Sequence, residues 1–299
     1  MTHRLRFALL LLASICWCVP VKGQDTACPF EEASLSFKGT ALEQATCLLR
    51  SVGIGGRLGQ SLKNLPGSLS KLIGQRVRIN RVAFERYLLS HNISEADIGG
   101  SISEPLSRAG GSDSNPVFAQ YFVIHDVSTP NYLDQPFPPN INDATWEWND
   151  LHKRWANTKV AHVFISRVGE SVTAVDFGSA LPAGRFGTKF ARDRLKETAK
   201  GLQLQVELIQ PRRSDPGRAP KNDAIAPLPG FTEAQLDRLA LIYVAASIRR
   251  GQWLIPAFHA AVDAGIPDTH DDPQNFDLDL WAKRLDELLK ELKRVQTWK

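Results

Sequence analysis

The chain has 299 residues, of which 43% are hydrophobic and 23% are charged. These values are close to the globular average and exclude a disordered, collagen-like or small disulfide-scaffold protein. A chain of this length forms one large domain or two ordinary ones. The formal net charge is +4, but residues 1–23 hold three basic residues and no acid, which leaves 33 basic and 32 acidic residues elsewhere. This balance gives no electrostatic reason to expect a nucleic-acid partner.

The first 23 residues have the pattern of a secretory signal peptide. A charged start over residues 1–6 precedes an apolar run over residues 7–19 that is too short to span a membrane. We therefore predict an exported protein, periplasmic or secreted, with cleavage near Gly23. A lipoprotein signal around Cys16 or Cys18 is the alternative, but neither cysteine follows a small-residue lipobox. No later segment has the length and apolarity of a transmembrane helix.

Removal of this leader leaves two cysteines, Cys28 and Cys47. In an oxidising compartment the pair is predicted to form one disulfide that contributes about 3 kcal/mol of stability. Two buried thiols are the alternative. A zinc site on this pair is not expected, because no further cysteine or histidine lies nearby in the sequence.

Residues 24–111 are predicted to form a small, mostly helical accessory unit. Apolar residues recur at helical spacing in three stretches, residues 42–49, 62–72 and 82–89. Residues 107–116, rich in Gly, Ser and Asp, indicate a linker, so the domain boundary is placed near Gly111. The predicted main domain covers residues 112–299 and is expected to fold without the accessory unit.

The main domain shows an α/β pattern. Apolar and β-branched stretches predict strands over residues 117–127, 159–167, 171–177 and 202–209. In the last strand the polar residues Gln203, Gln205 and Glu207 alternate with Leu and Val, which predicts a half-buried strand with these three on one face. Two helices follow: a buried one over residues 232–248 that opens with a Thr-Glu-Ala-Gln capping box, and an amphipathic one from about residue 278.

Two histidines and one aspartate make a candidate metal set. His125 lies near the end of the first strong strand, His259 follows the buried helix, and Asp272 lies thirteen positions further on. Two imidazoles and one carboxylate are a plausible zinc set that leaves a fourth position for water. The adjacent Asp271 is the alternative to Asp272 as the ligand.

Five motifs surround these residues in order. They are Val-Ile-His ending at His125, Ala-His-Val-Phe-Ile-Ser-Arg-Val-Gly over residues 161–169, Val-Glu-Leu over residues 206–208, Thr-Glu-Ala-Gln over residues 232–235, and His259 followed by Asp272-Pro273. In this order they resemble the zinc-dependent N-acetylmuramoyl-L-alanine amidase family, whose fold is shared with peptidoglycan recognition proteins. The resemblance covers roughly residues 117–289 and implies a central mixed β-sheet flanked by helices.

The resemblance further implies a hydrolase that cleaves the amide between N-acetylmuramic acid and L-alanine in peptidoglycan or muropeptides, with Zn²⁺ bound by His125, His259 and Asp272. Zinc lowers the pKa of its bound water to about 7 and polarises the scissile carbonyl. Glu207 is the candidate general base, and a solvated outer face of the sheet is the alternative location for its side chain. His270 falls where the family places a residue that contacts the tetrahedral intermediate.

Three features depart from the family pattern. The spacing from His259 to Asp272 is longer than expected, Leu181–Gly187 replaces a His-Ala-Gly segment, and residues 143–155 form an insertion with three tryptophans that is predicted to wall the cleft. His162 is interpreted as a strand-packing residue. Two other functions fit the same residues: a non-catalytic peptidoglycan-binding module of the same fold, and a zinc peptidase that acts on the stem peptide.

Overall fold

The computed structural model describes residues 27–109, 117–185, 187–195, 199–219, 222–267 and 270–297. The predicted signal peptide over residues 1–23 lies outside these residues, as does most of the predicted linker over residues 107–116. Among the described helices, none combines the length and the apolarity needed to cross a bilayer.

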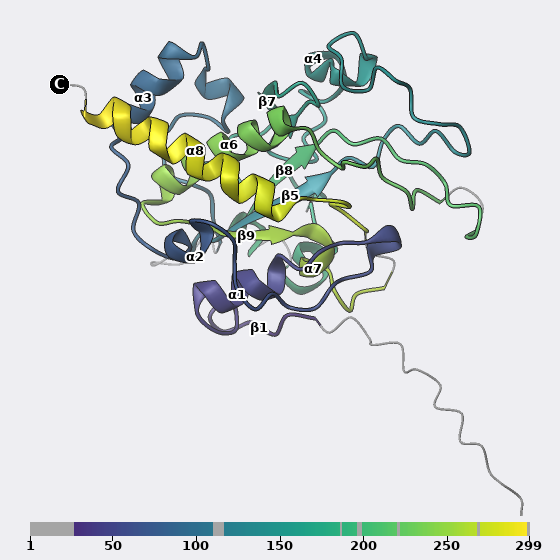
Figure 1. Ribbon diagram of the computed structural model, residues 1–299. Coiled ribbons are helices and arrows are strands. Elements are labelled where there is room, and N and C mark those ends of the chain that lie inside the picture. Colours follow the sequence, from purple (N-terminus) through teal and green to yellow (C-terminus); the bar gives the residue numbers. More distant parts are fainter. Residues whose placement is uncertain are drawn as a thin grey trace, which may run out of the picture.

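A five-stranded mixed sheet forms the centre of the protein, with the strand order β7-β6-β8-β5-β9 (Figure 1). Its strands are β5 (Tyr121–Asp126), β6 (Val163–Ile165), β7 (Ser171–Thr173), β8 (Gln203–Leu208) and β9 (Ile255–Phe258). Neighbouring strands are parallel except for β7, which pairs antiparallel with β6. Gly169 lies in the turn between these two with φ = 84°, a conformation that favours glycine. The predicted α/β class, a mixed sheet flanked by helices, is confirmed.

Strand β8 is buried on both faces, although its alternating sequence predicts a half-buried strand. Gln203 and Gln205 each expose only 1% of their surface. The Thr188 hydroxyl donates to Gln203 Oε1 at 3.0 Å, and Gln205 Nε2 donates to the same oxygen at 2.9 Å. These polar side chains are buried because they bond to one another and to a covering loop, which alternation in the sequence does not reveal.

Three helices cover one side of the sheet: one packs on the sheet, the second packs on the first, and the third packs on the second (Figure 1). In this order they are α6 (Glu233–Arg250), α8 (Leu278–Thr297) and α3 (Arg81–Ser90). Helix α6 begins at the predicted capping box, where the Thr232 hydroxyl accepts a hydrogen bond from the backbone N–H of Gln235 at 3.1 Å. Tyr243 of α6 contacts Phe122 of β5 on one side, with ring centroids 5.3 Å apart, and Trp281 of α8 at 5.5 Å. These aromatic contacts join the sheet to both long helices.

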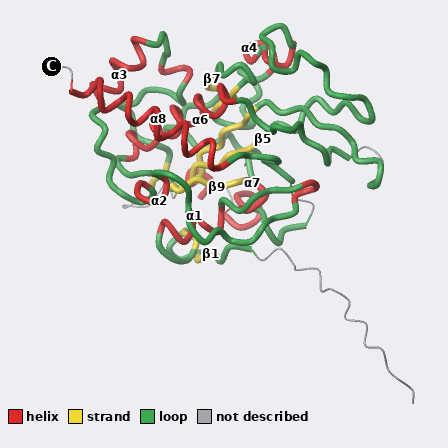
Figure 2. Tube along the Cα trace, viewed as in Figure 1, coloured by secondary structure: helices red, strands yellow, loops and turns green. Residues whose placement is uncertain are grey.

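Shorter elements complete the fold, and Figure 2 shows that loops connect them. They are the helices α1 (Ala41–Leu48), α2 (Leu69–Leu72), α4 (Leu151–Arg154) and α7 (His259–Val262), and the strands β1 (Phe30–Glu31), β2 (Ser36–Phe37), β3 (Arg108–Ala109) and β4 (Val117–Phe118). The strand predicted over residues 117–127 is therefore divided into β4 and β5.

The chain before the predicted boundary packs against the sheet. A disulfide joins Cys28, just before β1, to Cys47 near the end of α1, as predicted. Helix α1 lies against strand β9. Buried side chains of this region, Leu48 and Phe84 among them, belong to the same hydrophobic cluster as those of the sheet. The helices before residue 109 therefore share one core with the sheet.

Candidate metal centre

The carboxyl ends of three parallel strands bring the predicted site residues together. His125 is the fifth residue of β5, and the strand register places it beside Glu207 of β8. His259 is the first residue of α7, directly after β9. Asp272 lies in the loop that follows α7. In open parallel sheets the crevice outside the carboxyl ends of the strands is the usual place for a ligand.

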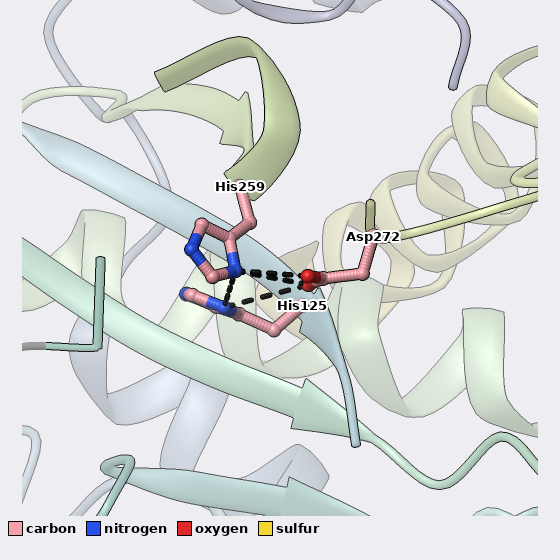
Figure 3. A group of neighbouring side chains, drawn as sticks. All are labelled: His125, His259 and Asp272. Carbon is pink, nitrogen blue, oxygen red and sulfur yellow. Dashed lines mark hydrogen bonds and ion pairs between the residues drawn. The ribbon is translucent and has the colours of Figure 1, made fainter. Parts of the chain in front are cut away.

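His125, His259 and Asp272 turn three ligand atoms toward one another (Figure 3). The Nδ1 atoms of the two imidazoles are 2.8 Å apart. The Asp272 carboxylate lies 2.9 Å from Nδ1 of His259 and 3.6 Å from Nδ1 of His125. Ligand atoms at about 2.0–2.1 Å from a tetrahedral zinc ion lie about 3.3 Å from one another. The three separations bracket this value, so the group can hold a metal ion.

The Nε2 atom of each imidazole, which points away from Asp272, is hydrogen-bonded to an acceptor. His259 Nε2 donates to Asp263 Oδ2 at 3.0 Å, and His125 Nε2 donates to the amide oxygen of Gln205. A neutral ring held in this way carries its proton on Nε2, so its Nδ1 presents a lone pair toward Asp272. Three acceptors converge in this way, and a shared cation satisfies all of them. Outer hydrogen bonds of this kind orient histidine ligands in metal sites.

The electrostatics of the group favour the same conclusion. Burial and the neighbouring His259 lower the pKa of His125 to about 3, so this imidazole is neutral. Burial opposes ionisation of Asp272, but the facing imidazoles, His259 first, outweigh it and hold the pKa of the carboxyl below its ordinary value. Burial also disfavours a charged His259, yet Asp272 and Asp263 outweigh it and raise its pKa. An anionic carboxylate here requires a positive charge beside it, which a proton or a metal ion provides.

Glu207 lies beside the three candidate ligands, and one of its carboxylate oxygens makes no hydrogen bond to the described residues. Its Oε1 is 3.9 Å from His125 Nδ1, and its buried Oε2 has no hydrogen-bond partner among the described residues. Burial, followed by the charge of Asp272, raises the pKa of Glu207 well above its ordinary value. The side chain therefore faces the crevice and not a solvated side of the sheet. A carboxyl group in this position is suited to exchange a proton with a ligand.

His270 and Asp271 differ in their relation to the group. The exposed His270 ring stacks on His259, with ring centroids 5.0 Å apart, and lines the same cavity. Asp271 faces elsewhere, because its Oδ1 lies 3.4 Å from Arg212 Nη1. The cluster that can hold a metal includes Asp272 and not Asp271.

His162 joins strand β8 to the loop after β7. Its Nδ1 accepts a hydrogen bond from the backbone N–H of Gln205 at 3.0 Å, and its Nε2 donates to the carbonyl of Ser179 at 3.0 Å. Burial lowers its pKa to about 4, so the ring is neutral. Both ring nitrogens are engaged in packing contacts, which agrees with the structural role predicted for this residue.

A buried ion pair between Arg212 and Asp126 supports the loop that carries Asp272. Arg212 Nη2 lies 2.6 Å from Asp126 Oδ2, and both side chains are fully buried. The backbone N–H of Asp126 donates to Asp272 Oδ2 at 3.1 Å, and Asp126 Oδ2 accepts from the backbone N–H of Gln274 at 3.3 Å. Sequence reasoning missed this pair. Asp126 offers a signal, since it directly follows a candidate ligand, whereas Arg212 offers none.

A cavity of about 500 Å³ opens over these residues. Besides the candidate ligands it is lined by Glu207, His270, Ser128, Thr129, Trp155, Gly184, Arg185, Gly187 and Asp223, among others. The tryptophan-rich insertion and the segment Leu181–Gly187 therefore both border the cleft. The indole Nε1 of Trp155 is a buried donor without a partner in the described part of the chain.

Comparisons of this chain with protein-family models, with curated proteins and with solved structures found no match. The site is therefore interpreted from its own geometry. It combines a buried group that can hold a metal ion, an adjacent carboxyl group and a cavity open to a ligand.

Proposed function

We propose that this protein is a zinc hydrolase that cleaves the amide between N-acetylmuramic acid and L-alanine in peptidoglycan or muropeptides. The observation that carries the proposal is the convergence of His125, His259 and Asp272 beside Glu207 at the carboxyl ends of parallel strands. Two imidazoles and one carboxylate are a donor set typical of catalytic zinc and leave one position for water. When bound, zinc lowers the pKa of this water and polarises the scissile carbonyl.

The side chains of the protein supply the remaining chemistry. Glu207, which lines the cavity beside His125, accepts a proton from the attacking water and delivers a proton to the leaving amine. His270, exposed and stacked on His259, donates a hydrogen bond to the oxyanion. Asp263 and Gln205 keep the two imidazoles in their orientation through Nε2.

The substrate is inferred from the order of motifs around the site. The resemblance to the amidase family spans residues 117–289 and includes all three candidate ligands. The cavity of about 500 Å³ has the size of a small-molecule site. Export agrees with this substrate, because the Cys28–Cys47 disulfide is typical of oxidising compartments outside the cytosol.

Product analysis tests the proposed reaction. Purified peptidoglycan is incubated with the protein, with and without added Zn²⁺, and the new amino termini are identified. Cleavage of the proposed bond releases peptides that begin with L-alanine and leaves free lactyl groups on muramic acid. New amino termini within the stem peptide would identify a peptidase instead. Binding without products at full zinc occupancy would identify a binding module.

The substitution Glu207→Gln tests the proton-transfer role. It keeps the shape of the side chain, so we expect the metal content and the fold to be retained while turnover falls about 10²–10⁴-fold. The matched control is Glu170→Gln, which changes an exposed glutamate just before β7. Near-normal turnover in the Glu207 variant would contradict the assignment and leave His270 as the next candidate.

A further inference from the structure

A second, larger cavity lies at the other end of the sheet from the metal centre. It has a volume of about 1060 Å³ and lies between the chain around α2 and the carboxyl-terminal half of α8. Trp253, which lines it, precedes the amino end of β9, whereas His259 follows the carboxyl end of the same strand. Figure 1 shows α2, α3 and the end of α8 on one side of the molecule and the loops after β5 and β8 on the other. We call this cavity the basic groove.

The basic groove carries an excess of positive charge. Its basic residues are Lys71, Arg76, Arg78, Lys290 and Lys293, and all five are exposed. Within the described ranges of the chain, their side chains make no hydrogen bond or ion pair. The acidic residue of the lining, Asp286, accepts a hydrogen bond from the backbone N–H of Ser68 at 3.2 Å. This charge is a local concentration, because the chain after residue 23 has 33 basic and 32 acidic residues.

Apolar side chains lie beside these charges. Leu72, Ile79 and Leu289 line the groove and are half-buried. A ligand for this surface needs negative charges spread over a wide area and an apolar layer next to them.

We propose that the basic groove docks the protein onto the surface of an anionic lipid bilayer. Headgroup phosphates attract clustered Lys and Arg side chains, and the boundary between headgroups and acyl chains accepts exposed apolar side chains. The five cations are not held in place by bonds to other side chains, which suits a fluid array of headgroups better than a protein partner with acidic residues at defined positions. In this orientation the metal centre faces away from the bilayer. The inference does not depend on the proposed hydrolytic activity.

Vesicle binding by the full chain tests this docking. Vesicles of phosphatidylcholine with about one third phosphatidylglycerol should sediment the protein, pure phosphatidylcholine vesicles should not, and added salt should release it. Each lysine near such a surface contributes about a fivefold factor, so Lys290→Ala/Lys293→Ala should weaken binding about 30-fold. Both lysines are exposed on α8, and alanine favours a helix, so the fold is retained.

The control removes the same charge elsewhere. Lys38→Ala/Lys153→Ala changes exposed residues that do not line the groove, and it should leave binding unchanged. Any contribution from the apolar residues 7–19 is common to all variants and cancels. Equal binding by the two double variants, or equal binding to both kinds of vesicle, would overturn the proposal. Binding of an acidic amphipathic peptide without binding to either vesicle would also overturn it, in favour of a protein partner.

Discussion

At the scale of single residues, two adjacent aspartates have different surroundings. Asp272 lies 2.9 Å from His259 Nδ1, whereas Asp271 lies 3.4 Å from Arg212 Nη1. The hydrogen bond from the backbone N–H of Asp126 to Asp272 Oδ2 fixes which carboxylate faces the imidazoles. The conformation of the loop therefore gives the two aspartates different roles: Asp272 faces the imidazoles and Asp271 faces Arg212.

This difference predicts opposite effects of the same substitution at the two positions. We expect Asp272→Asn to weaken zinc binding by more than about 100-fold, because even the loss of an outer partner of a ligand costs about 10–100-fold. Asp271→Asn should retain the metal, since its carboxylate lies outside the group. Metal content after dialysis against a zinc buffer, measured by elemental analysis, separates the two. Equal losses in both variants would contradict the assignment of Asp272 as the ligand.

The sequence identifies the candidate ligands but not all the residues that hold them. His125 and His259 are recognisable because each adjoins a predicted element and stands within an ordered set of motifs. Asp263 lies four positions after His259, within one helical turn, and so has a local signal. Arg212 pairs with Asp126 across a separation of 86 positions, and only the folded sheet brings them together. Long-range pairs of this kind leave no spacing pattern to detect.

At the scale of elements, local signals predict helix α6 well and strand β9 not at all. The capping box Thr232–Gln235 and the glycine after Arg250 set the ends of α6, because both act within one turn of the chain. Strand β9 spans only four residues and contains Pro256, and a proline argues against a strand because it has no backbone N–H to donate. The proline is tolerated because β9 is an edge strand that pairs only with β5 in the described sheet.

The packing of His162 between elements predicts a pH dependence of stability. Burial holds its pKa near 4, against an ordinary value of 6.5, and outweighs the hydrogen bond to the Ser179 carbonyl and the charge of Asp176, which raise it. The unfolded chain therefore binds a proton more readily than the folded one. The resulting stabilisation is complete above about pH 6.5 and is lost as the pH falls toward 4, where the loss reaches about 3 kcal/mol.

Comparison with His162→Gln isolates this contribution. The glutamine does not titrate, so the difference in unfolding free energy between the two proteins should be largest near neutral pH and shrink as the pH approaches 4. Urea unfolding in the presence of a chelator measures this difference without a contribution from bound metal. Other titrating groups are common to both proteins and cancel. A difference that stays constant over this pH range would contradict a neutral, buried His162.

At the scale of the whole molecule, the region before residue 109 is joined to the sheet by polar and apolar contacts. The Tyr121 hydroxyl of β5 donates to Gln44 Oε1 at 2.8 Å and accepts from the backbone N–H of Phe37 at 2.9 Å. The Phe37 ring also stacks on Phe190, with centroids 5.3 Å apart. Each fully buried Leu or Phe contributes about 1.5–3 kcal/mol, and the net stability of a domain is about 5–15 kcal/mol. Loss of several such contacts therefore exceeds what a domain tolerates.

The sequence predicts an independent main domain. From the shared core we expect the opposite: residues 112–299 alone should bind a hydrophobic dye and should show no cooperative unfolding. The part of the shared cluster that lies before residue 109, including Leu48 and Phe84, would be missing, and the apolar surface that it covers would be exposed. Calorimetry and dye fluorescence measure both effects. As the matched experiment, a protease site introduced within residues 110–116 of the full chain is cut after folding. The two fragments should remain associated and keep their metal, because the cut leaves the core complete. A truncated chain that unfolds cooperatively and binds zinc stoichiometrically would show that the main domain is independent after all.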